Sequence, residues 1–161
     1  MLDSIKQKLK QINLIEATQY KKAGVLILLL KEDKDAEYKI VFTKRSTKLK
    51  THSGEVSFPG GKWEEADNSL YETALRESNE EINLNIENVT KLGNLNFLLS
   101  RHKIEVNPYV GYLDKFQEFE GNFEIDEIFT VPISFLSDSK NVTYKEFNRK
   151  DLKVYIPCLL Y

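Results

Sequence analysis

Cysteine and histidine are scarce in this chain, and their scarcity excludes several kinds of protein. One cysteine, Cys158, and two histidines occur among 161 residues. A single cysteine cannot form a disulfide within the chain, so we expect a reducing, cytoplasmic setting. Zinc sites need cysteine and histidine ligands at short spacing, and His52 and His102 lack both cysteine partners and such spacing. The sequence therefore predicts a fold stabilised by its core alone.

Strong charge and long apolar runs are absent as well. The 23 basic and 25 acidic side chains leave a net charge of −2, which offers no general attraction to nucleic acids or anionic membranes. The longest apolar run, residues 23–30, is far shorter than the roughly 20 residues that span a bilayer. Only 7 glycines and 4 prolines occur, which excludes collagen-like and low-complexity chains. We expect neither nucleic acid nor membrane as a partner.

The patterning that remains predicts one α+β domain over residues 1–161. A chain of this length buries about 68–70% of its unfolded surface, which is enough for a core. A long amphipathic helix is expected over residues 70–82, preceded by the capping box Ser69 to Glu72 and ended at Asn83. Apolar residues at three- and four-residue steps predict a second helix near the N-terminus. Strands are expected over residues 24–30, 38–43, 92–99, 106–113, 128–131 and 154–160, the first two forming a hairpin. Because helices and strands do not alternate regularly, we expect a mixed sheet with a helix on one face and another element on the other.

The long helix carries three carboxylates that can attract a cation. Glu77, Glu80 and Glu81 are spaced i, i+3 and i+4, which places them on one helical face. Two such charges about 6 Å apart repel by about 3 kcal/mol at an effective dielectric constant of 20, and Arg76 alone cannot cancel three of them. Mg²⁺ or Mn²⁺ would suit an all-oxygen set of ligands. The simpler interpretation is a solvated acidic face. The preceding Phe58-Pro-Gly-Gly61 segment favours a site, because its glycines allow backbone N–H groups to approach a phosphate chain.

These motifs resemble the Nudix box, G-x5-E-x7-R-E-U-x-E-E-x-G-U with U apolar. Gly61, Asp67 and the segment from Arg76 to Leu84 match it with four departures. Asp67 replaces glutamate and is separated from Arg76 by eight residues instead of seven, Ser78 replaces an apolar residue, and Asn83 replaces glycine. The resemblance implies the Nudix fold, a mixed β-sheet between helices (α/β/α).

A second motif is similar to a signature of the coenzyme A diphosphatase subgroup, L-L-T-x-R-S-x3-R-x3-G-x3-F-P-G-G. The matching segment runs from Val41 through Arg45-Ser46 and Gly54 to Phe58-Pro-Gly-Gly61, and Lys50 replaces its second arginine. The first two departures from the Nudix box are usual in this subgroup. In the family a C-terminal helix follows a strand like residues 154–160, so the end of the sequence at Tyr161 leads us to expect that helix to be missing.

The resemblance implies metal-dependent hydrolysis of coenzyme A to adenosine 3′,5′-bisphosphate and 4′-phosphopantetheine. Glu77 and Glu81 would bind Mg²⁺ or Mn²⁺, and Glu80 would be a third ligand or the general base. Arg76 would hold these carboxylates by ion pairs. Family members differ in the base, so Glu124, and after it Glu118 or Glu120, are alternatives. Four residues are expected to bind the substrate. Arg45 and Lys50 would bind its negatively charged phosphates, and the backbone of Gly60 and Gly61 would lie beside them.

Two other classes of function stay open at this point. The chain could hydrolyse another nucleoside diphosphate derivative, such as ADP-ribose, NADH or a dinucleoside polyphosphate. It could also be a non-catalytic module that binds a nucleotide. The presence of all three helix carboxylates favours an enzyme. A small-molecule nucleotide is the expected partner in each case, and a homodimer is compatible with the sequence.

Overall fold

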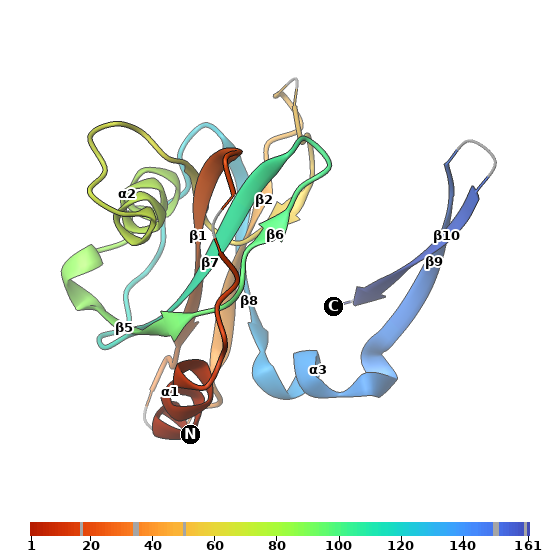
Figure 1. The fold of residues 1–161 in the computed structure, drawn as a ribbon. Coiled ribbons are helices and arrows are strands. Elements are labelled where there is room, and N and C mark those ends of the chain that lie inside the picture. The colour runs from red at the N-terminus through yellow and green to blue at the C-terminus, as the bar shows by residue number, and fades with distance from the viewer. Residues whose placement is uncertain (17, 34–35, 50, 150–151, 160) are drawn as a thin grey trace.

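The fold is built on a mixed β-sheet with β1 (Lys21–Leu30) at its centre (Figure 1). The computed structural model describes residues 1–16, 18–33, 36–49, 51–149, 152–159 and 161. In this sheet β1 pairs in parallel with β7 and antiparallel with β2 and β4. β3 and β8 pair with β2, whereas β5 and β6 pair with β7. The bounds of these strands are β2 Lys39–Arg45, β3 Val56–Ser57, β4 Gly60–Lys62, β5 Val89–Asn94, β6 Leu98–Leu99, β7 Ile104–Leu113 and β8 Ile125–Pro132.

Two helices cover opposite faces of this sheet. α2 (Leu70–Ile82) packs on the face to which β1 contributes Leu26, Leu28 and Leu30, whose side chains are almost entirely buried. α1 (Leu2–Lys10) packs on the other face, where Leu29 of β1 meets β5 and β7. Alternate residues of a strand point to opposite faces, so one continuous apolar run supplies both cores. The expected α+β fold with a mixed sheet between helices is confirmed.

The helix α2 begins and ends where the sequence predicts. The Ser69 hydroxyl accepts a hydrogen bond from the Glu72 N–H at 3.2 Å, and Asn83 ends the helix in the left-handed conformation with φ 53°. Gly24 of β1 lets the helix lie close to the sheet, because a side chain there would collide with the Leu70 carbonyl. This close approach brings the second half of α2 against β4.

Several elements differ from the predicted strands. The single strand expected over residues 92–99 is two, β5 and β6, which both pair with β7 and are separated by residues 95–97. β3, β4, β9 and the short helices were not predicted. Those helices are η1 (Ile86–Asn88), α3 (Ile133–Ser137) and η2 (Ser139–Asn141). Within the described ranges, no helix is long and apolar enough to cross a membrane.

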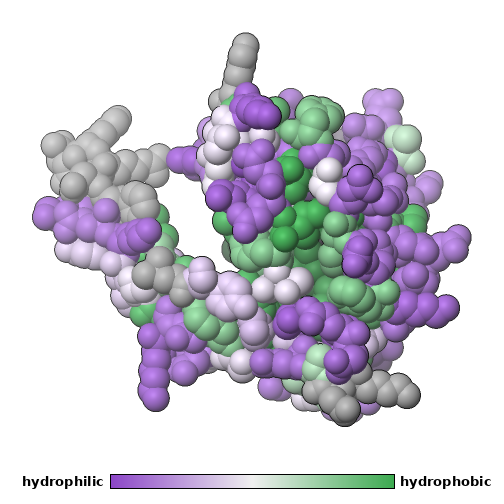
Figure 2. Space-filling view, turned by 180° about the vertical axis from the view of Figure 1, so that it is seen from behind, coloured by the Kyte–Doolittle hydropathy of each residue, from purple (hydrophilic) through white to green (hydrophobic). Residues whose placement is uncertain are grey.

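The last two strands form a separate hairpin. β9 (Val142–Arg149) and β10 (Leu152–Leu159) pair only with each other among the described strands and project from the main sheet after α3 (Figure 1). Seen from behind, the surface is hollowed beside this hairpin, and apolar residues are visible on the floor of the hollow (Figure 2). Tyr144 and Tyr155 of the hairpin are largely exposed. The helices and strands that carry the sequence motifs described above lie in the main sheet and α2, away from this hairpin.

Candidate active site

The core of the candidate site is a contact between α2 and β4. The backbone N–H of Gly60 donates a hydrogen bond to Glu81 Oε2 at 3.0 Å. Gly61 lies over the carboxylate of Glu77, and a Cβ at Gly61 would stand 2.5 Å from both of its oxygens. The two glycines therefore leave the space that two helix carboxylates occupy.

The electrostatics of these carboxylates disfavour their charged forms. Burial, reinforced by the negative charges of Glu77 and Glu124, raises the pKa of Glu81 to about 7, although the Gly60 N–H and Arg45 oppose the rise. Burial also raises the pKa of Glu77. A divalent cation would offset both effects, and carboxylate oxygens are the ligands that Mg²⁺ and Mn²⁺ prefer. The donor set of the site thus fits such an ion.

Arg76 connects α2 to the loop that precedes it. Its Nε lies 2.9 Å from Asp67 Oδ1, and its Nη2 lies 3.1 Å from Asp67 Oδ2. The guanidinium beside it lowers the pKa of Asp67 to about 2, and the carboxylates raise the pKa of Arg76. Arg76 also reaches Glu77 and Glu80 at 3.2 Å each. Arg76 thus forms ion pairs with three carboxylates of the motif.

Glu80 differs from its two neighbours in burial. Its side chain is 54% exposed, whereas that of Glu77 is 19% exposed, and Glu81 is buried. The expected single face of three carboxylates is thus divided between the sheet and the solvent. Across the residues that the structure describes, no three His, Cys, Asp or Glu side chains lie together as a ready metal site.

The loop between β7 and β8 brings a further carboxylate to the site. Asn122 donates from its backbone N–H to the Glu81 carbonyl at 3.0 Å and from its side chain to the Glu80 carbonyl at 2.9 Å. This contact places Glu124 beside Glu81, whose pKa it raises. Glu124 Oε2 in turn lies 2.9 Å from Arg45 Nη2. Among the alternatives for the base, Glu124 is thus within the electrostatic field of the site, and Glu118 and Glu120 are exposed on the loop.

The residues expected to bind substrate have varied placements. Arg45 lies near Glu81 but is engaged by Glu124 and by the Thr51 carbonyl, which its Nε reaches at 3.3 Å. Lys50 lies outside the described residues. Gly60 and Gly61 lie in strand β4 and not in a free loop, because they pair with β1. The N–H of Gly60 is already bound to Glu81, so the expected phosphate contact from this N–H is replaced by a contact that fixes a carboxylate.

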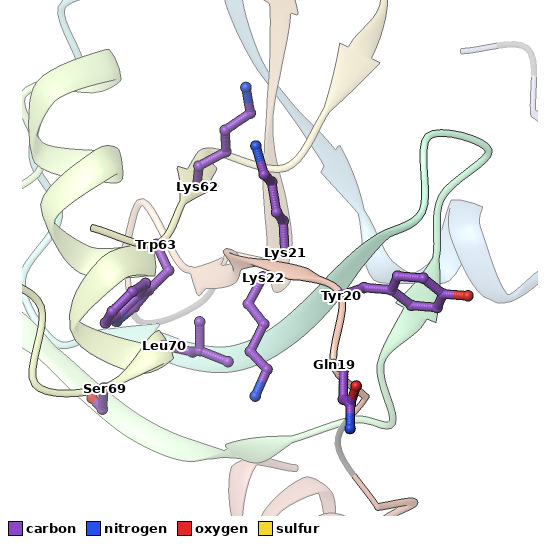
Figure 3. A pocket seen from close by; sticks show the side chains of 8 residues that line it. All are labelled: Gln19, Tyr20, Lys21, Lys22, Lys62, Trp63, Ser69 and Leu70. Atoms are coloured by element: carbon purple, nitrogen blue, oxygen red, sulfur yellow. The ribbon is translucent and has the colours of Figure 1, made fainter. Parts of the chain in front are cut away.

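A pocket beside β4 was missed by the sequence analysis. It has a volume of about 720 Å³ and lies at the start of β1, between β4 and the N-terminus of α2 (Figure 3). Its lining comprises Gln19, Tyr20, Lys21, Lys22, Lys62, Trp63, Ser69 and Leu70. The one available signal was the position of Lys62 and the single tryptophan directly after Gly61. The strand pairing that brings these two residues to Lys21 and Lys22 is not visible in the sequence.

Comparison with known proteins assigns the family. The NUDIX domain model matches residues 20–147, which include the whole main sheet and α2. The fold is similar to that of a Nudix hydrolase from M. smegmatis, RenU, with a TM-score of 0.60 over 72% of this chain and 73% of that one, at 14% identity. The chain therefore belongs to the Nudix family, as the motifs predicted.

Sequence relatives give finer similarities. The chain is 43% identical to Nudix hydrolase 15, mitochondrial, of Arabidopsis thaliana over 73% of its length, and this match spans 42% of the plant protein. It is 31% identical to the peroxisomal coenzyme A diphosphatase NUDT7 of Mus musculus over its full length, spanning 69% of that protein. It is 36% identical to the peroxisomal coenzyme A diphosphatase ndx-8 of Caenorhabditis elegans over 76% of its length, spanning 53% of that protein. The chain thus covers less than half of the plant relative.

Proposed function

We propose that this chain hydrolyses the pyrophosphate linkage of coenzyme A or a derivative with the help of Mg²⁺ or Mn²⁺. The observation that carries the proposal is the placement of Glu77 and Glu81 beneath Gly60 and Gly61, where burial disfavours their charged forms. A divalent cation would offset the free-energy cost of the charged form of these buried carboxylates. A pyrophosphate bound through the same cation would complete its coordination.

The chain's own residues have distinct roles in this proposal. Glu77 and Glu81 would bind the cation, and Arg76 fixes the helix to Asp67 so that both carboxylates keep their positions under β4. Glu124 or Glu80 accepts a proton from the attacking water. That water forms a bond to one phosphorus while the bond from this phosphorus to the bridging oxygen breaks, and the second phosphate leaves. The bound cation would neutralise the pyrophosphate, polarise a phosphoryl oxygen and lower the pKa of the water.

Two observations favour coenzyme A as the substrate within the family. Three residues of the signature lie at the carboxylates: Arg45 lowers the pKa of Glu81, and Gly60 and Gly61 lie against Glu81 and Glu77. Two relatives of this chain, from mouse and nematode, are named coenzyme A diphosphatases. The expected products are adenosine 3′,5′-bisphosphate and 4′-phosphopantetheine.

The test is product analysis with a panel of substrates. The protein is incubated with coenzyme A, ADP-ribose, NADH or diadenosine polyphosphates, each with Mg²⁺, with Mn²⁺ or with a chelator. We expect the two named products from coenzyme A, loss of turnover with the chelator, and the highest kcat/KM for coenzyme A. Glu81→Gln should abolish most turnover, whereas Glu87→Gln, which removes an exposed carboxylate on η1, should not. Faster cleavage of ADP-ribose or a dinucleotide than of coenzyme A would refute the proposed substrate.

A further inference from the structure

We propose that the pocket at the start of β1 binds the phosphorylated nucleoside end of the substrate, with the ring against Trp63 and the phosphate between lysines. This assignment rests on the proposed function, which supplies a substrate with an adenosine 3′-phosphate at one end. The pocket of about 720 Å³ is large enough for a nucleotide-sized group. It contains both kinds of contact that such a group needs, an aromatic wall and cations.

The aromatic wall is fixed in orientation. The indole N–H of Trp63 donates a hydrogen bond to the Asp67 carbonyl at 3.1 Å. With its polar atom bonded to the protein, the ring remains 46% exposed. Leu70, at the first turn of α2, lies beside it in the same pocket (Figure 3). A flat, exposed and oriented ring is the kind of surface on which a base stacks.

The cations of the pocket lack acidic partners. Within the described part of the chain, no ion pair involves Lys21, Lys22 or Lys62. Lys21 and Lys62 extend side by side, and Lys22 extends in the opposite direction, past Leu70 (Figure 3). The positive charge of Lys22 helps to lower the pKa of the buried Glu105. The ammonium groups of Lys21 and Lys62 lie on the same side, have no ion-pair partner among the described residues, and are suited to a phosphate, which brings negative charge and several acceptor oxygens.

The pocket and the candidate active site are both bordered by β4. Lys62 follows Gly61 directly, and its carbonyl accepts a hydrogen bond from Arg76 Nη2 at 3.2 Å. The same arginine is bonded to Asp67, which carries the carbonyl that orients Trp63. The pocket and the carboxylates are therefore held by one set of contacts. A ligand whose pyrophosphate lies at Glu77 and Glu81 has this pocket as the adjacent place for its next group.

The far wall of the pocket is also anchored. Glu105 of β7, which is 1% exposed, accepts hydrogen bonds from the Thr18 N–H at 2.6 Å and the Thr18 hydroxyl at 2.7 Å. Thr18 directly precedes Gln19 and Tyr20, which line the pocket. Glu105 thus positions this segment without lining the pocket itself. A preformed wall lowers the entropic cost of binding.

Because Trp63 is the only tryptophan of the chain, its fluorescence reports directly on the pocket. The probe is adenosine 3′,5′-bisphosphate, titrated into the full chain with a chelator present so that no hydrolysis contributes. We expect a saturable change in tryptophan emission. A charged hydrogen bond contributes about 1.5–3 kcal/mol, so Lys62→Gln and Lys21→Gln should each weaken binding by about 10-fold or more. Lys10→Gln, on the exposed side of α1, is the matched control and should leave the Kd unchanged.

Two further titrations identify what the pocket recognises. Adenosine without phosphate should bind at least about 10-fold more weakly than the bisphosphate, for the same reason. Pyrophosphate alone should also bind more weakly, because it has no ring to stack on Trp63. Equal affinity for pyrophosphate and the bisphosphate would overturn the nucleoside assignment. An unchanged Kd in both lysine variants, with folded protein shown by circular dichroism, would overturn the phosphate assignment.

The outcomes separate this inference from the proposed function. Suppose that coenzyme A is cleaved, but that the bisphosphate does not change Trp63 emission in the parent or in either lysine variant. The pocket assignment is then wrong and the proposed function stands. If the bisphosphate binds with the expected lysine dependence but coenzyme A is not cleaved, the proposed function is wrong and the pocket is a nucleotide site of another reaction. For an active enzyme, Lys62→Gln should raise KM for coenzyme A more than for its 3′-dephospho form.

Discussion

Asp67 offers the sharpest quantitative test of how the site is held together. Its carboxylate accepts two hydrogen bonds from Arg76 and one from the Thr73 hydroxyl at 2.8 Å, and its side chain is only 5% exposed. The Arg76 guanidinium lowers the pKa of Asp67 from 3.8 to about 2. One pKa unit corresponds to about 1.4 kcal/mol, so this shift contributes about 2 kcal/mol to the free energy of unfolding.

The pH dependence follows from the direction of the shift. An acid with a lowered pKa in the folded state stabilises the fold above its unfolded pKa, here 3.8, and loses that contribution as the pH falls through about 2. Asp67→Asn should therefore reduce the free energy of unfolding by about 2 kcal/mol at pH 6 and by about half as much at pH 3. For a chain of this size the loss at pH 6 corresponds to about 4–8 °C in Tm.

The assay is urea unfolding of both proteins at several pH values, followed by circular dichroism. Asp3→Asn serves as the control, because it removes the same charge from an exposed position on α1. We expect its effect to be small at every pH. A penalty for Asp67→Asn that is equal at pH 6 and pH 3, or below about 0.5 kcal/mol at pH 6, would show that the ion pair with Arg76 does not stabilise the fold in this way.

The remaining predictions concern the carboxylates and glycines. The pKa of Glu81 is raised to about 7, so its negative charge should destabilise the fold increasingly as the pH rises from about 4.5 to 7. At pH 8 the Glu81→Gln variant should therefore be more stable than the parent by about 1–3 kcal/mol. The same variant should turn over substrate about 10²–10⁴ times more slowly. Mg²⁺ should raise the Tm of the parent but not of this variant. Gly60→Ala should cost about 2 kcal/mol or more in urea unfolding, because φ is +143° and its Cβ would lie 2.6 Å from the Val25 Cα. Gly61→Ala should displace Glu77 and reduce kcat more than stability. Arg45→Ala should move the acidic limb of the kcat profile to higher pH, because Arg45 lowers the pKa of Glu81.

The elements that the sequence predicted well depend on local interactions. The helix α2 is defined by its cap at Ser69, its stop at Asn83 and an apolar stripe between them, all within a short stretch of chain. The hairpin of β1 and β2 has the same character, because an apolar run and an alternating run follow each other across a charged turn. Local signals of this kind are independent of the rest of the fold. The carboxylates of α2 were therefore placed on the correct helix before any tertiary contact was known.

The features that the sequence could not predict depend on distant pairings. The pairing of β4 with β1 turns Gly60 and Gly61 from a loop into a strand and gives the Gly60 N–H to Glu81. The ion pair of Arg45 with Glu124 joins residues 79 positions apart through the pairing of β2 with β8. Contacts between similarly distant residues determine how deeply each helix carboxylate is buried. Helical spacing places three carboxylates on one face, but only packing decides that Glu81 is buried and Glu80 is exposed.

Asp67 and Glu81 differ in their ion pairing and in the direction of their pKa shifts, and this difference explains how one short motif can combine stability with reactivity. The buried Asp67 and the partly exposed Arg76 form an ion pair, so the aspartate has a low pKa and stabilises the loop before α2. Glu81 is one turn further along α2 from Glu77 and has no ion-pair partner among the described residues, so burial raises its pKa. The stability that the Asp67–Arg76 ion pair contributes offsets the free-energy cost of keeping the Glu81 carboxylate in an environment that disfavours its charge. In the proposed function a divalent cation would offset this cost at Glu81, as Arg76 does at Asp67.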